Sequence, residues 1–594
     1  MLSAAADGTS FFTIFVDTHT TKMPAPLLQI NNLQVDFVTE IGTTTAVNNI
    51  SLTVNRGEIV AIVGESGSGK SVTSLSVLQL LPKPPARYTT GEILFSVNGE
   101  EPVNLLTQTA EQMRAIRGNH IAMIFQEPMT SLNPVFTCGH QVQEALRLHL
   151  KIAKKEAKQK TIELFKQVQL PNPEMLYRRY PHQLSGGQKQ RVMIAMAMSC
   201  EPSLLICDEP TTALDVTVQK TILQLIKELQ QKRQMGVIFI THDLGVVAEV
   251  ADRAVVMYRG EIVESGRVAD LFTNPQHPYT KGLLACRPVL HPRGERLPIV
   301  SDFLENNRTF DLHRYSQAAV QPVVEKQPDV VKPPFIQVSR LNVWFPSKKN
   351  LLGKPLEYVK AIDNIRFEIY KGETLGLVGE SGCGKTTLGR TLLGLIQPTS
   401  GSVYYDGTDL SKIDAGTMKE MRKDIQIIFQ DPYSSLNPRL TIGSAIAEPL
   451  KVHSIINGSM QRKDKVVELL EKVNLKAEHF NRYPHEFSGG QRQRIVIARA
   501  LALNPSFIVC DESVSALDVS VQAQVLNLLN DLKAEMGFTI VFISHDLSVV
   551  RYISDRIMVM NKGKIEEIGD AEQVYFKPQK EYTRQLIASI PKGR

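Results

Sequence analysis

The sequence lacks long hydrophobic runs. No stretch of 18 or more apolar residues occurs in the 594 residues, so no segment is predicted to cross a bilayer as a helix. The apolar run at residues 11–16 is too short for a signal-peptide core, and Asp7 and Asp17 flank it where basic residues are required. We therefore expect a cytosolic protein. Residues 1–26 are predicted to be a disordered N-terminal extension, with Met23 as an alternative start.

Cysteine and excess charge of one sign are also scarce. The six cysteines form no Cys-x-x-Cys pair, which favours reduced thiols over a disulfide framework or a metal site. Lys and Arg number 67 against 61 Asp and Glu, and this formal charge of +6 is too mild to indicate nucleic acid as a partner. With 43% hydrophobic and 22% charged residues, the composition excludes a disordered polymer and a collagen-like fibre.

What the sequence does contain is an internal repeat. Gly64–Ser71 (Gly-Glu-Ser-Gly-Ser-Gly-Lys-Ser) returns as Gly379–Thr386 (Gly-Glu-Ser-Gly-Cys-Gly-Lys-Thr). Three further motifs, which begin at Tyr180, Cys207 and Thr241, return later in the chain at one constant offset. Chance similarity would not preserve one spacing between motifs over such a distance. The chain is therefore predicted to be a tandem duplication of one catalytic domain.

The repeat defines the predicted domains. They cover residues 27–286 and 335–594, and the linker between them, at 287–334, is rich in proline. The segment 322–334 favours an extended, semi-stiff spacer that lets the copies face each other without fusing their cores. The prediction leaves open whether Arg296-Leu297-Pro298 packs on a domain surface.

The glycine-rich loops are predicted to bind phosphate. Each follows an apolar strand-like run and precedes a helical pattern, which is the context that a phosphate-binding loop requires. Its backbone N–H groups and the helix N-terminus attract anions, Lys70 or Lys385 adds a positive charge, and Ser71 or Thr386 is suited to Mg²⁺. The predicted ATP ligands are Gly64, Glu65, Ser66, Gly67, Ser68, Gly69, Lys70 and Ser71, and Gly379, Glu380, Ser381, Gly382, Cys383, Gly384, Lys385 and Thr386.

Two acids end an apolar strand in each copy. Asp208-Glu209 and Asp511-Glu512 follow such strands, and paired buried charge is costly unless a cation offsets it. We expect Asp208 and Asp511 to contact Mg²⁺, and Glu209 and Glu512 to polarise the attacking water. The alternative is an acid that caps the turn after the strand.

A histidine follows a β-branched strand at the same spacing after the glutamate in both copies. His242 and His545 are predicted to bond a γ-phosphate or to position the water, although a lone histidine at a strand end is more often structural. A Ser-Gly-Gly-Gln motif likewise precedes each glutamate at one spacing, at a predicted helix start that suits an anion. These predicted anion ligands are Ser185, Gly186, Gly187 and Gln188, and Ser488, Gly489, Gly490 and Gln491.

These motifs together resemble the nucleotide-binding domain of ATP-binding cassette (ABC) proteins, over nearly the whole chain. The resemblance implies an α/β fold of two tandem ABC ATPase domains, each with a RecA-like P-loop core and a helical subdomain. It implies that Gln126 and Gln430 sense Mg²⁺ and a membrane subunit, and that Ala213–Asp215 and Ala516–Asp518 are D-loops. Phe37 and Phe345 take the place of an adenine-stacking aromatic, but a strand-end Phe is as easily a core residue.

ABC domains work as head-to-tail pairs. The resemblance therefore implies that Lys70 shares one ATP with Ser488, and that Lys385 shares another with Ser185. In this resemblance, Leu184–Gln188 and Phe487–Gln491 correspond to the signature motif of the family. Both copies retain the glutamate, the histidine and the glycines of the signature. We therefore predict two hydrolytic sites, with ATP and Mg²⁺ at each.

The segments 126–134 and 430–438, which end in Ser-Leu-Asn-Pro, and the tail Asn274–Thr280 resemble the oligopeptide, dipeptide and nickel importer group. The second copy keeps a weaker form of this tail at 577–583. The fusion is similar to glutathione importer ATPases. This implies an energy-coupling subunit for a di-/oligopeptide or glutathione-like substrate. It also implies two permease subunits, a solute-binding protein, and peripheral association at the cytoplasmic face of the inner membrane. Some relatives carry an iron–sulfur cysteine cluster after this tail; here only Cys286 is present, so no cluster is predicted.

The alternative is a tandem ABC ATPase that acts on ribosomes and likewise lacks a membrane span. That class has a strongly basic helical linker, whereas this linker is Pro-rich and weakly charged. DNA-repair and chromosome-structure ATPases need zinc-binding insertions or long heptads, and neither is present. Tandem sugar-importer ATPases lack the Leu-Asn-Pro and His-Pro-Tyr-Thr elements.

Overall fold

The computed structural model describes residues 25–40, 42–97, 101–127, 131–212, 214–305, 333–349 and 355–591. Four sequence predictions fall wholly or largely outside these ranges. They concern the extension at 1–26, the extended spacer at 322–334, residues 128–130 within the segment 126–134 that ends in Ser-Leu-Asn-Pro, and Ala213 of the first D-loop.

Each copy contains two sheets, and this is the predicted α/β architecture. In the first copy, a four-stranded antiparallel sheet has the order β2-β1-β4-β5, and a six-stranded sheet has the order β10-β9-β3-β8-β7-β6. The six-stranded sheet is parallel except at the β10–β9 edge. The strands are β1 (Leu28–Thr39), β2 (Gly42–Val54), β3 (Ile59–Val63), β4 (Ala86–Phe95), β5 (Val103–Asn104), β6 (Ile121–Ile124), β7 (Leu204–Asp208), β8 (Gly236–Ile240), β9 (Arg253–Tyr258) and β10 (Glu261–Arg267).

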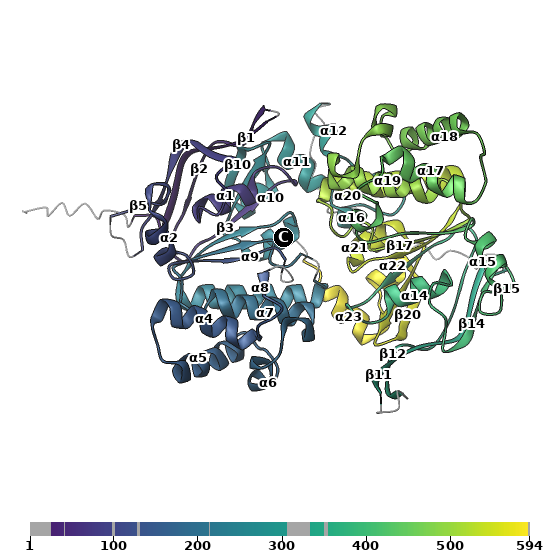
Figure 1. The fold of residues 1–594 in the computed structure, drawn as a ribbon, viewed down its shortest axis with the longest axis horizontal. Helices are drawn as coiled ribbons and strands as arrows, with labels where there is room; N and C mark the ends of the chain where they lie inside the picture. Colours follow the sequence, from purple (N-terminus) through teal and green to yellow (C-terminus); the bar gives the residue numbers. More distant parts are fainter. Residues whose placement is uncertain are drawn as a thin grey trace, which may run out of the picture.

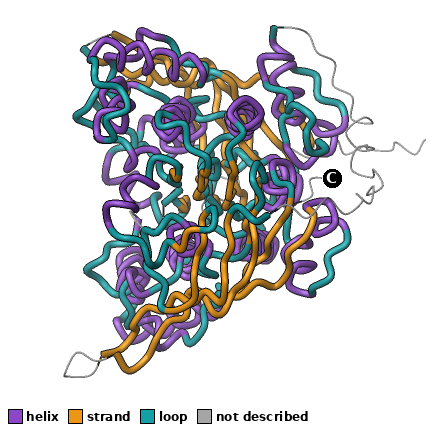
Figure 2. The backbone as a smooth tube through the Cα atoms, turned by 90° about the vertical axis from the view of Figure 1, so that its right-hand side faces the viewer, coloured by secondary structure: helices purple, strands orange, loops and turns teal. Residues whose placement is uncertain are grey.

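The second copy repeats this plan. Its sheets have the orders β12-β11-β14-β15 and β16-β17-β18-β13-β19-β20. The strands are β11 (Ile336–Lys349), β12 (Pro355–Ile369), β13 (Thr374–Val378), β14 (Ser400–Tyr405), β15 (Thr408–Asp409), β16 (Ile425–Ile428), β17 (Phe507–Asp511), β18 (Thr539–Ile543), β19 (Arg556–Asn561) and β20 (Lys564–Asp570). Seen from the outer side of this copy, the strands run through the middle with helices around them (Figure 2).

Helices cover the sheets and form the predicted helical subdomains, α4–α7 in the first copy and α17–α19 in the second. The helices of the first copy are α1 (Lys70–Val77), α2 (Ala110–Ile116), α4 (Cys138–Leu150), α5 (Lys154–Gln167), α6 (Pro173–Tyr177), α7 (Gly186–Ala197), α8 (Val216–Arg233), α9 (Leu244–Val250), α10 (Val268–Thr273), α11 (Pro278–Ala285) and α12 (Val300–Leu304). Those of the second copy are α14 (Lys385–Leu392), α15 (Ala415–Met421), α16 (Pro432–Ser435), α17 (Ile442–Val452), α18 (Ser459–Lys472), α19 (Gly489–Leu501), α20 (Val519–Met536), α21 (Leu547–Ile553), α22 (Ala571–Phe576) and α23 (Glu581–Ala588). Short 3₁₀ turns are η1 (Leu105–Thr107), η2 (Pro181–Gln183), η3 (Pro288–Leu290), η4 (Ala477–Asn481) and η5 (Pro484–Glu486).

The central strands are apolar on both faces because the sheets are covered on both sides. All five residues of β3, β7 and β8 are buried, and so are those of β13, β17 and β18. Parallel strands of this kind present their carboxyl ends at one edge of the sheet. The phosphate loop, the acidic pair and the histidine all follow such strands, so the fold brings them to the same edge.

The copies lie head to tail (Figure 1). The antiparallel sheet of the first copy and the helical subdomain of the second lie along the upper side of the molecule in this view. Their counterparts lie along the lower side. α11 and α12 lie beside α20 at one end, and α23 lies near α8 at the other (Figure 1), where Lys220 Nζ donates to Ala588 O at 3.0 Å.

The first part of the predicted linker folds onto the second copy. The Asn527 side chain, on α20, accepts from Leu297 N at 3.0 Å and donates to Leu297 O at 2.8 Å. Tyr552 Oη donates to Glu295 O at 2.8 Å, and Arg296 forms a two-point ion pair with Asp531 at 3.0 and 2.7 Å. Residues 287–304, which we call the strap, thus extend the first domain onto the surface of its neighbour.

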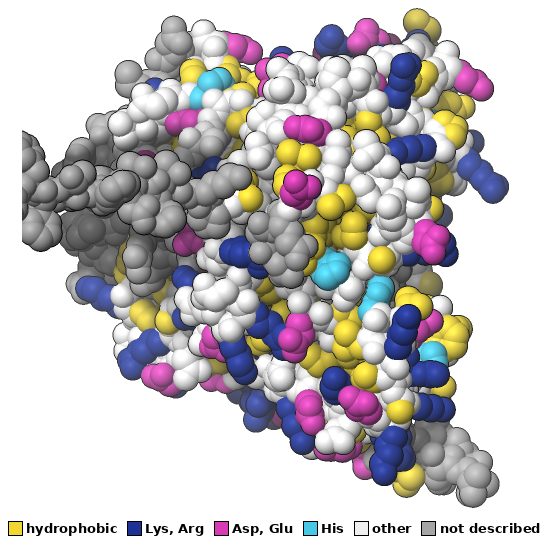
Figure 3. All heavy atoms as spheres, turned by 90° about the vertical axis from the view of Figure 1, so that its left-hand side faces the viewer, with side chains coloured by type: hydrophobic (Ala, Val, Ile, Leu, Met, Phe, Trp, Pro, Cys, Tyr) yellow, Lys and Arg dark blue, Asp and Glu magenta, His cyan; other side chains and the backbone are white. Residues whose placement is uncertain are grey.

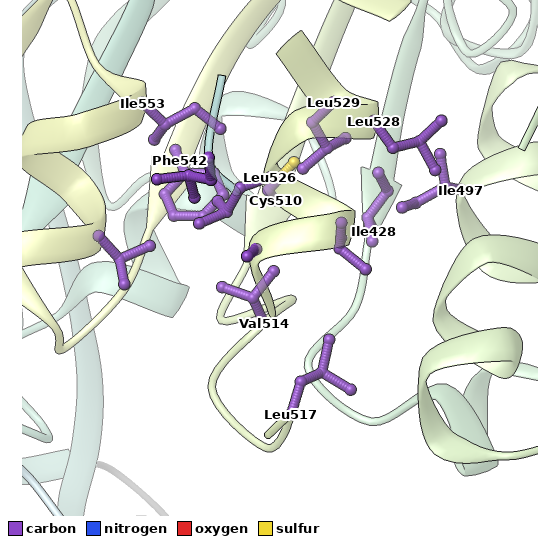
Figure 4. Close-up of a cluster of buried hydrophobic side chains, with 14 of the residues drawn as sticks. Ile428, Ile497, Cys510, Val514, Leu517, Leu526, Leu528, Leu529, Phe542 and Ile553 are labelled. Carbon is purple, nitrogen blue, oxygen red and sulfur yellow. The ribbon is translucent and has the colours of Figure 1, made fainter. Parts of the chain in front are cut away.

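The strap joins the two hydrophobic cores. One continuous cluster of buried side chains contains Leu283, Leu297 and Val300 together with residues of α20 and β17. Figure 4 shows part of it, with Leu526 and Leu529 of α20 near Cys510, which precedes Asp511-Glu512. The expectation that the linker keeps the cores separate is therefore wrong. The sequence does not reveal this packing because the strap residues follow no clear period.

The described residues contain no helix that is both long and apolar enough to span a bilayer. All six cysteines are buried free thiols.

Replacing Asn527 with Ala should lower the free energy of unfolding by about 2 kcal/mol, because it leaves the N–H and C=O groups of buried Leu297 unpaired. Urea denaturation of the full chain measures the change. Gln224, which occupies the matching position on α8 and is exposed, provides the control. Equal effects of N527A and Q224A would contradict the docking of the strap.

Candidate active sites

The first phosphate loop is shaped by its glycines. Gly69, with φ of 101°, precedes α1, and a side chain there would meet Ala46 O at 2.7 Å. The Lys70 side chain is 6% exposed, and its Nζ donates to Gly64 O and Glu65 O, each at 2.8 Å. Burial lowers the Lys70 pKa, while nearby carboxylates oppose that shift.

The loop fits a phosphate group. The Ser68 hydroxyl is buried and has no hydrogen-bond partner among the described residues, so a bound oxyanion would supply one. The second loop has the same form: Gly384 has φ of 108°, and Lys385 Nζ donates to Gly379 O at 2.7 Å and to Glu380 O at 3.1 Å.

A hydroxyl and a carboxylate meet beside each loop. Ser71 Oγ donates to Asp208 Oδ1 at 3.2 Å, and Thr386 Oγ1 donates to Asp511 Oδ1 at 3.0 Å. Burial raises the pKa of Asp208 to about 6 and also raises that of Asp511. Hydroxyl and carboxylate oxygens are ligands that suit Mg²⁺, and the cation would neutralise a buried carboxylate whose charge is otherwise costly.

Side chains from three parts of the first copy contact the Glu209 carboxylate. Gln126 Nε2 donates to its Oε2 at 3.1 Å, Thr212 Oγ1 donates to the same oxygen at 2.9 Å, and His242 Nδ1 lies 3.4 Å from Oε1. Burial alone would raise the Glu209 pKa, but the hydrogen bond and charge of His242 outweigh it and bring that pKa to about 2. The pKa of His242 is raised, because Glu209 outweighs the effect of burial. Glu209 therefore stays ionised as a hydrogen-bond acceptor.

The second copy repeats this cluster with one difference. Gln430 Nε2 donates to Glu512 Oε2 at 2.9 Å, and His545 Nδ1 lies 3.6 Å from the same oxygen. Burial opposes the shift, yet His545 lowers the Glu512 pKa. Ser515, which matches Thr212, instead donates to the Glu512 backbone carbonyl at 2.9 Å. The Glu512 carboxylate thus lacks the hydroxyl donor that Thr212 supplies to Glu209.

Both glutamates have a left-handed backbone, with φ of 46° at Glu209 and 49° at Glu512. Such a conformation is unfavourable for a residue with a side chain and is commonly retained where function requires it. It turns the chain sharply after β7 and β17, so that the aspartate stays in the strand while the glutamate leaves it.

Each copy also holds the phosphate loop of the other. Asp518 Oδ2 accepts from Ser66 N at 2.8 Å, and Asp215 Oδ2 accepts from Ser381 N at 3.3 Å. Both aspartates precede a helix but make no side-chain hydrogen bond to cap it. Thr217 Oγ1 also donates to the Glu380 carboxylate at 2.9 Å. These contacts give the predicted D-loops a direct role at the opposite site.

A cavity of about 140 Å³ lies between the two clusters. His242 and Asp243 line it from the first copy, His545 and Asp546 line it from the second, and Arg287 of the strap completes it. Burial lowers the Arg287 pKa, and the two aspartates oppose that shift. The Arg287 guanidinium thus lies within electrostatic range of one acid from each copy.

The structure does not bring every predicted residue to these clusters. Ser185 and Ser488 are exposed, and each closes a capping box with the glutamine three residues later, at the start of α7 or α19. Their pairing with the opposite lysine remains a prediction. Phe37 packs partly on the core, and Phe345 is 41% exposed, so the adenine role of both also remains a prediction.

Sequence reasoning misses three contributions to the sites. Thr212 lies three residues after Glu209, which is a spacing that suits a turn but does not specify a carboxylate contact. Tyr279, in the tail of the first copy, and Tyr582, in the matching tail at 577–583 of the second, contact the phosphate loops through the N–H groups of Glu65 and Glu380. The Tyr-Thr pair common to both tails is the available signal.

Comparison with known proteins agrees with this geometry. A family model described as ABC transporter matches residues 47–212 and 362–515, and one described as Oligopeptide/dipeptide transporter, C-terminal region matches 263–310. Proteins named Glutathione import ATP-binding protein GsiA from Salmonella choleraesuis (strain SC-B67), Escherichia coli (strain K12) and Pectobacterium atrosepticum are 51%, 50% and 49% identical. Each alignment covers 95% of this chain and 89% of the relative.

Replacing Asp518 with Ala should weaken ATP binding at the first loop about tenfold, because a hydrogen bond from Ser66 N to a charged acceptor is lost. The measurement is titration with a fluorescent ATP analogue in a K385A background, where only the first loop retains its lysine. Asp464→Ala, at an exposed position of α18, is the control. Unchanged affinity in D518A would remove Asp518 from the site.

Proposed function

This chain belongs to the ABC transporter family of ATP-binding proteins, and on that premise we propose how its sites act and which import they drive. The chain is the ATP-hydrolysing subunit of an ABC importer. The observation that carries the proposal is the repeated cluster in which one glutamate, held by a glutamine and a histidine, lies beside a phosphate loop. Neither copy has lost a member of that cluster, so we propose two hydrolytic sites.

At each site, Glu209 or Glu512 accepts a hydrogen bond from the attacking water and polarises it. His242 lowers the Glu209 pKa against the effect of burial, so Glu209 is an ionised acceptor that can orient this water. His242, with its raised pKa, can donate to a γ-phosphate oxygen while it holds Glu209. Lys70 turns from the loop carbonyls to the phosphates when ATP enters.

Ser71 and Asp208, and Thr386 and Asp511, are proposed to hold Mg²⁺, with Gln126 and Gln430 completing its environment. When bound, Mg²⁺ neutralises charge on the β- and γ-phosphates. Gln126 and Gln430 also contact the catalytic glutamates, so a movement of either glutamine changes the position of a water-activating carboxylate.

Permease subunits are proposed to dock beside these glutamines. Phe125, Val135 and Phe136 are 40%, 70% and 44% exposed in the first copy, and Phe429 and Tyr433 are 38% and 64% exposed in the second. Exposed apolar side chains that lie near each glutamine in the sequence favour a protein partner there. On the outer face of the first copy, acidic and basic side chains are interspersed with apolar ones (Figure 3), which does not favour a polyanion.

The proposed cargo is a di- or oligopeptide, including the tripeptide-like glutathione, delivered by a solute-binding protein. The relatives at about half identity are named for glutathione import, and the tail matches an oligopeptide/dipeptide transporter region. Docking on its permease would place the chain peripherally at the cytoplasmic face of the inner membrane. The ribosome-associated alternative is not favoured by any of these matches.

Replacing Glu209 and Glu512 together with Gln should abolish phosphate release, with turnover falling at least a hundredfold, while ATP binding persists. The isosteric change retains the contact with His242 but removes the charge. Phosphate release and nucleotide retention by the purified chain measure the two effects. Gln224→Glu controls for surface charge. Substantial residual phosphate release in the double variant would refute the assigned roles.

Deleting the gene should abolish ATP-dependent uptake of peptides or glutathione by cells that use this importer. The wild-type chain should restore uptake, and the E209Q/E512Q chain should not. Radiolabelled glutathione, dipeptides and oligopeptides distinguish the cargo. Undiminished uptake of all three classes, together with co-purification of the chain with ribosomes, would favour the alternative function.

A further inference from the structure

We propose that Tyr279 and Tyr582, on the tail helices α11 and α23, are positioning residues for the phosphate loops. Tyr279 Oη accepts a hydrogen bond from Glu65 N at 3.0 Å, and Tyr582 Oη accepts one from Glu380 N at 3.3 Å. In each copy, the tail therefore forms a hydrogen bond with the second residue of the phosphate loop of that copy. The inference deepens the proposed ATPase function by assigning a role to tails that do not touch the reacting atoms.

The Tyr279 hydroxyl has a fixed position. The side chain is fully buried, and its ring centroid lies 4.3 Å from that of Tyr258, at the end of β9. α11 begins at Pro278, and the His277 side chain accepts from Tyr279 N at 3.2 Å. Proline at the first helical position and a side-chain cap both define where a helix starts. The phenol oxygen is therefore held by the core, next to the loop.

The two peptide groups on either side of Glu65 have further contacts. Lys70 Nζ donates to Gly64 O, in the same peptide group as Glu65 N, and to Glu65 O in the next group, where Asp518 of the second copy accepts from Ser66 N. When ATP draws Lys70 to its phosphates, both carbonyl groups lose that donor. The Tyr279 contact does not involve Lys70, so it continues to hold the Gly64–Glu65 peptide group at the start of the loop whose later N–H groups face phosphate.

The second copy has a looser version of the same device. Asn561 replaces the Tyr258 ring at the matching position and donates to Glu566 at 3.2 Å. Lys580 precedes α23 without a side-chain cap, and Tyr582 is only partly buried. Since the hydrogen bond is also longer, removing the hydroxyl should affect the first loop more than the second.

The test uses Tyr→Phe variants of the full chain, which retain the ring and remove only the acceptor. In a K385A background, Y279F should weaken binding of a fluorescent ATP analogue about tenfold. In a K70A background, Y582F should weaken it about threefold. In the chain with both lysines, Y279F should raise the KM for ATP while kcat stays within about twofold, because the phenol touches no reacting atom.

Tyr258→Phe is the matched control, because its ring lies in the same cluster but its hydroxyl is not the acceptor for Glu65 N. An unchanged Kd in Y279F overturns the proposal. So does a loss of affinity accompanied by a fall in Tm that Y258F reproduces, since that pattern indicates packing alone. ATP binding is measured without permease or cargo, so a failure of the import proposal in uptake assays leaves this result interpretable.

Discussion

Each phosphate loop in this chain is held partly by an aspartate of the other copy. A loop rich in glycine has many accessible conformations, and its backbone N–H groups bind phosphate only when they converge. Asp518 fixes Ser66 N, and Asp215 fixes Ser381 N, so the geometry of one site depends on the position of the other domain. The head-to-tail arrangement is thus part of the active site and not merely a way of packing two domains.

The acidic pairs show how one strand end produces two different carboxylates. Asp208 lies within the buried strand, where burial raises its pKa to about 6, so it gains from a cation. Glu209 lies one residue further on, turned by its left-handed backbone toward Gln126 and His242, and its pKa falls to about 2. The second copy has the same arrangement at Asp511-Glu512, with Gln430 and His545 in the places of Gln126 and His242.

Sequence reasoning locates the residues whose signals are local. The strand–loop–helix context of Lys70 and the repeated spacing between the glutamate and the histidine lead to the clusters that the structure displays. Contacts between distant segments cannot be inferred, because no single-sequence pattern links Leu297 to Asn527 or Tyr279 to Glu65. The separate-core expectation fails for the same reason: the strap is Pro-rich in composition, yet its apolar side chains find a partner in the other copy. The predicted pairing of Ser185 and Ser488 with the opposite lysines runs through a bound nucleotide. The predicted adenine contacts of Phe37 and Phe345 do so as well, so the chain alone does not define either.

The crossing of the strap has a consequence for biosynthesis. A ribosome completes Leu297 well before Asn527, which lies 230 residues further along the chain. At about 5–20 residues per second, that interval lasts about 10–50 s. Throughout it, the apolar side chains of the strap have no surface of the second copy to cover them. The first domain is therefore synthesised early, but its packing is complete only when the second copy has folded against Leu297.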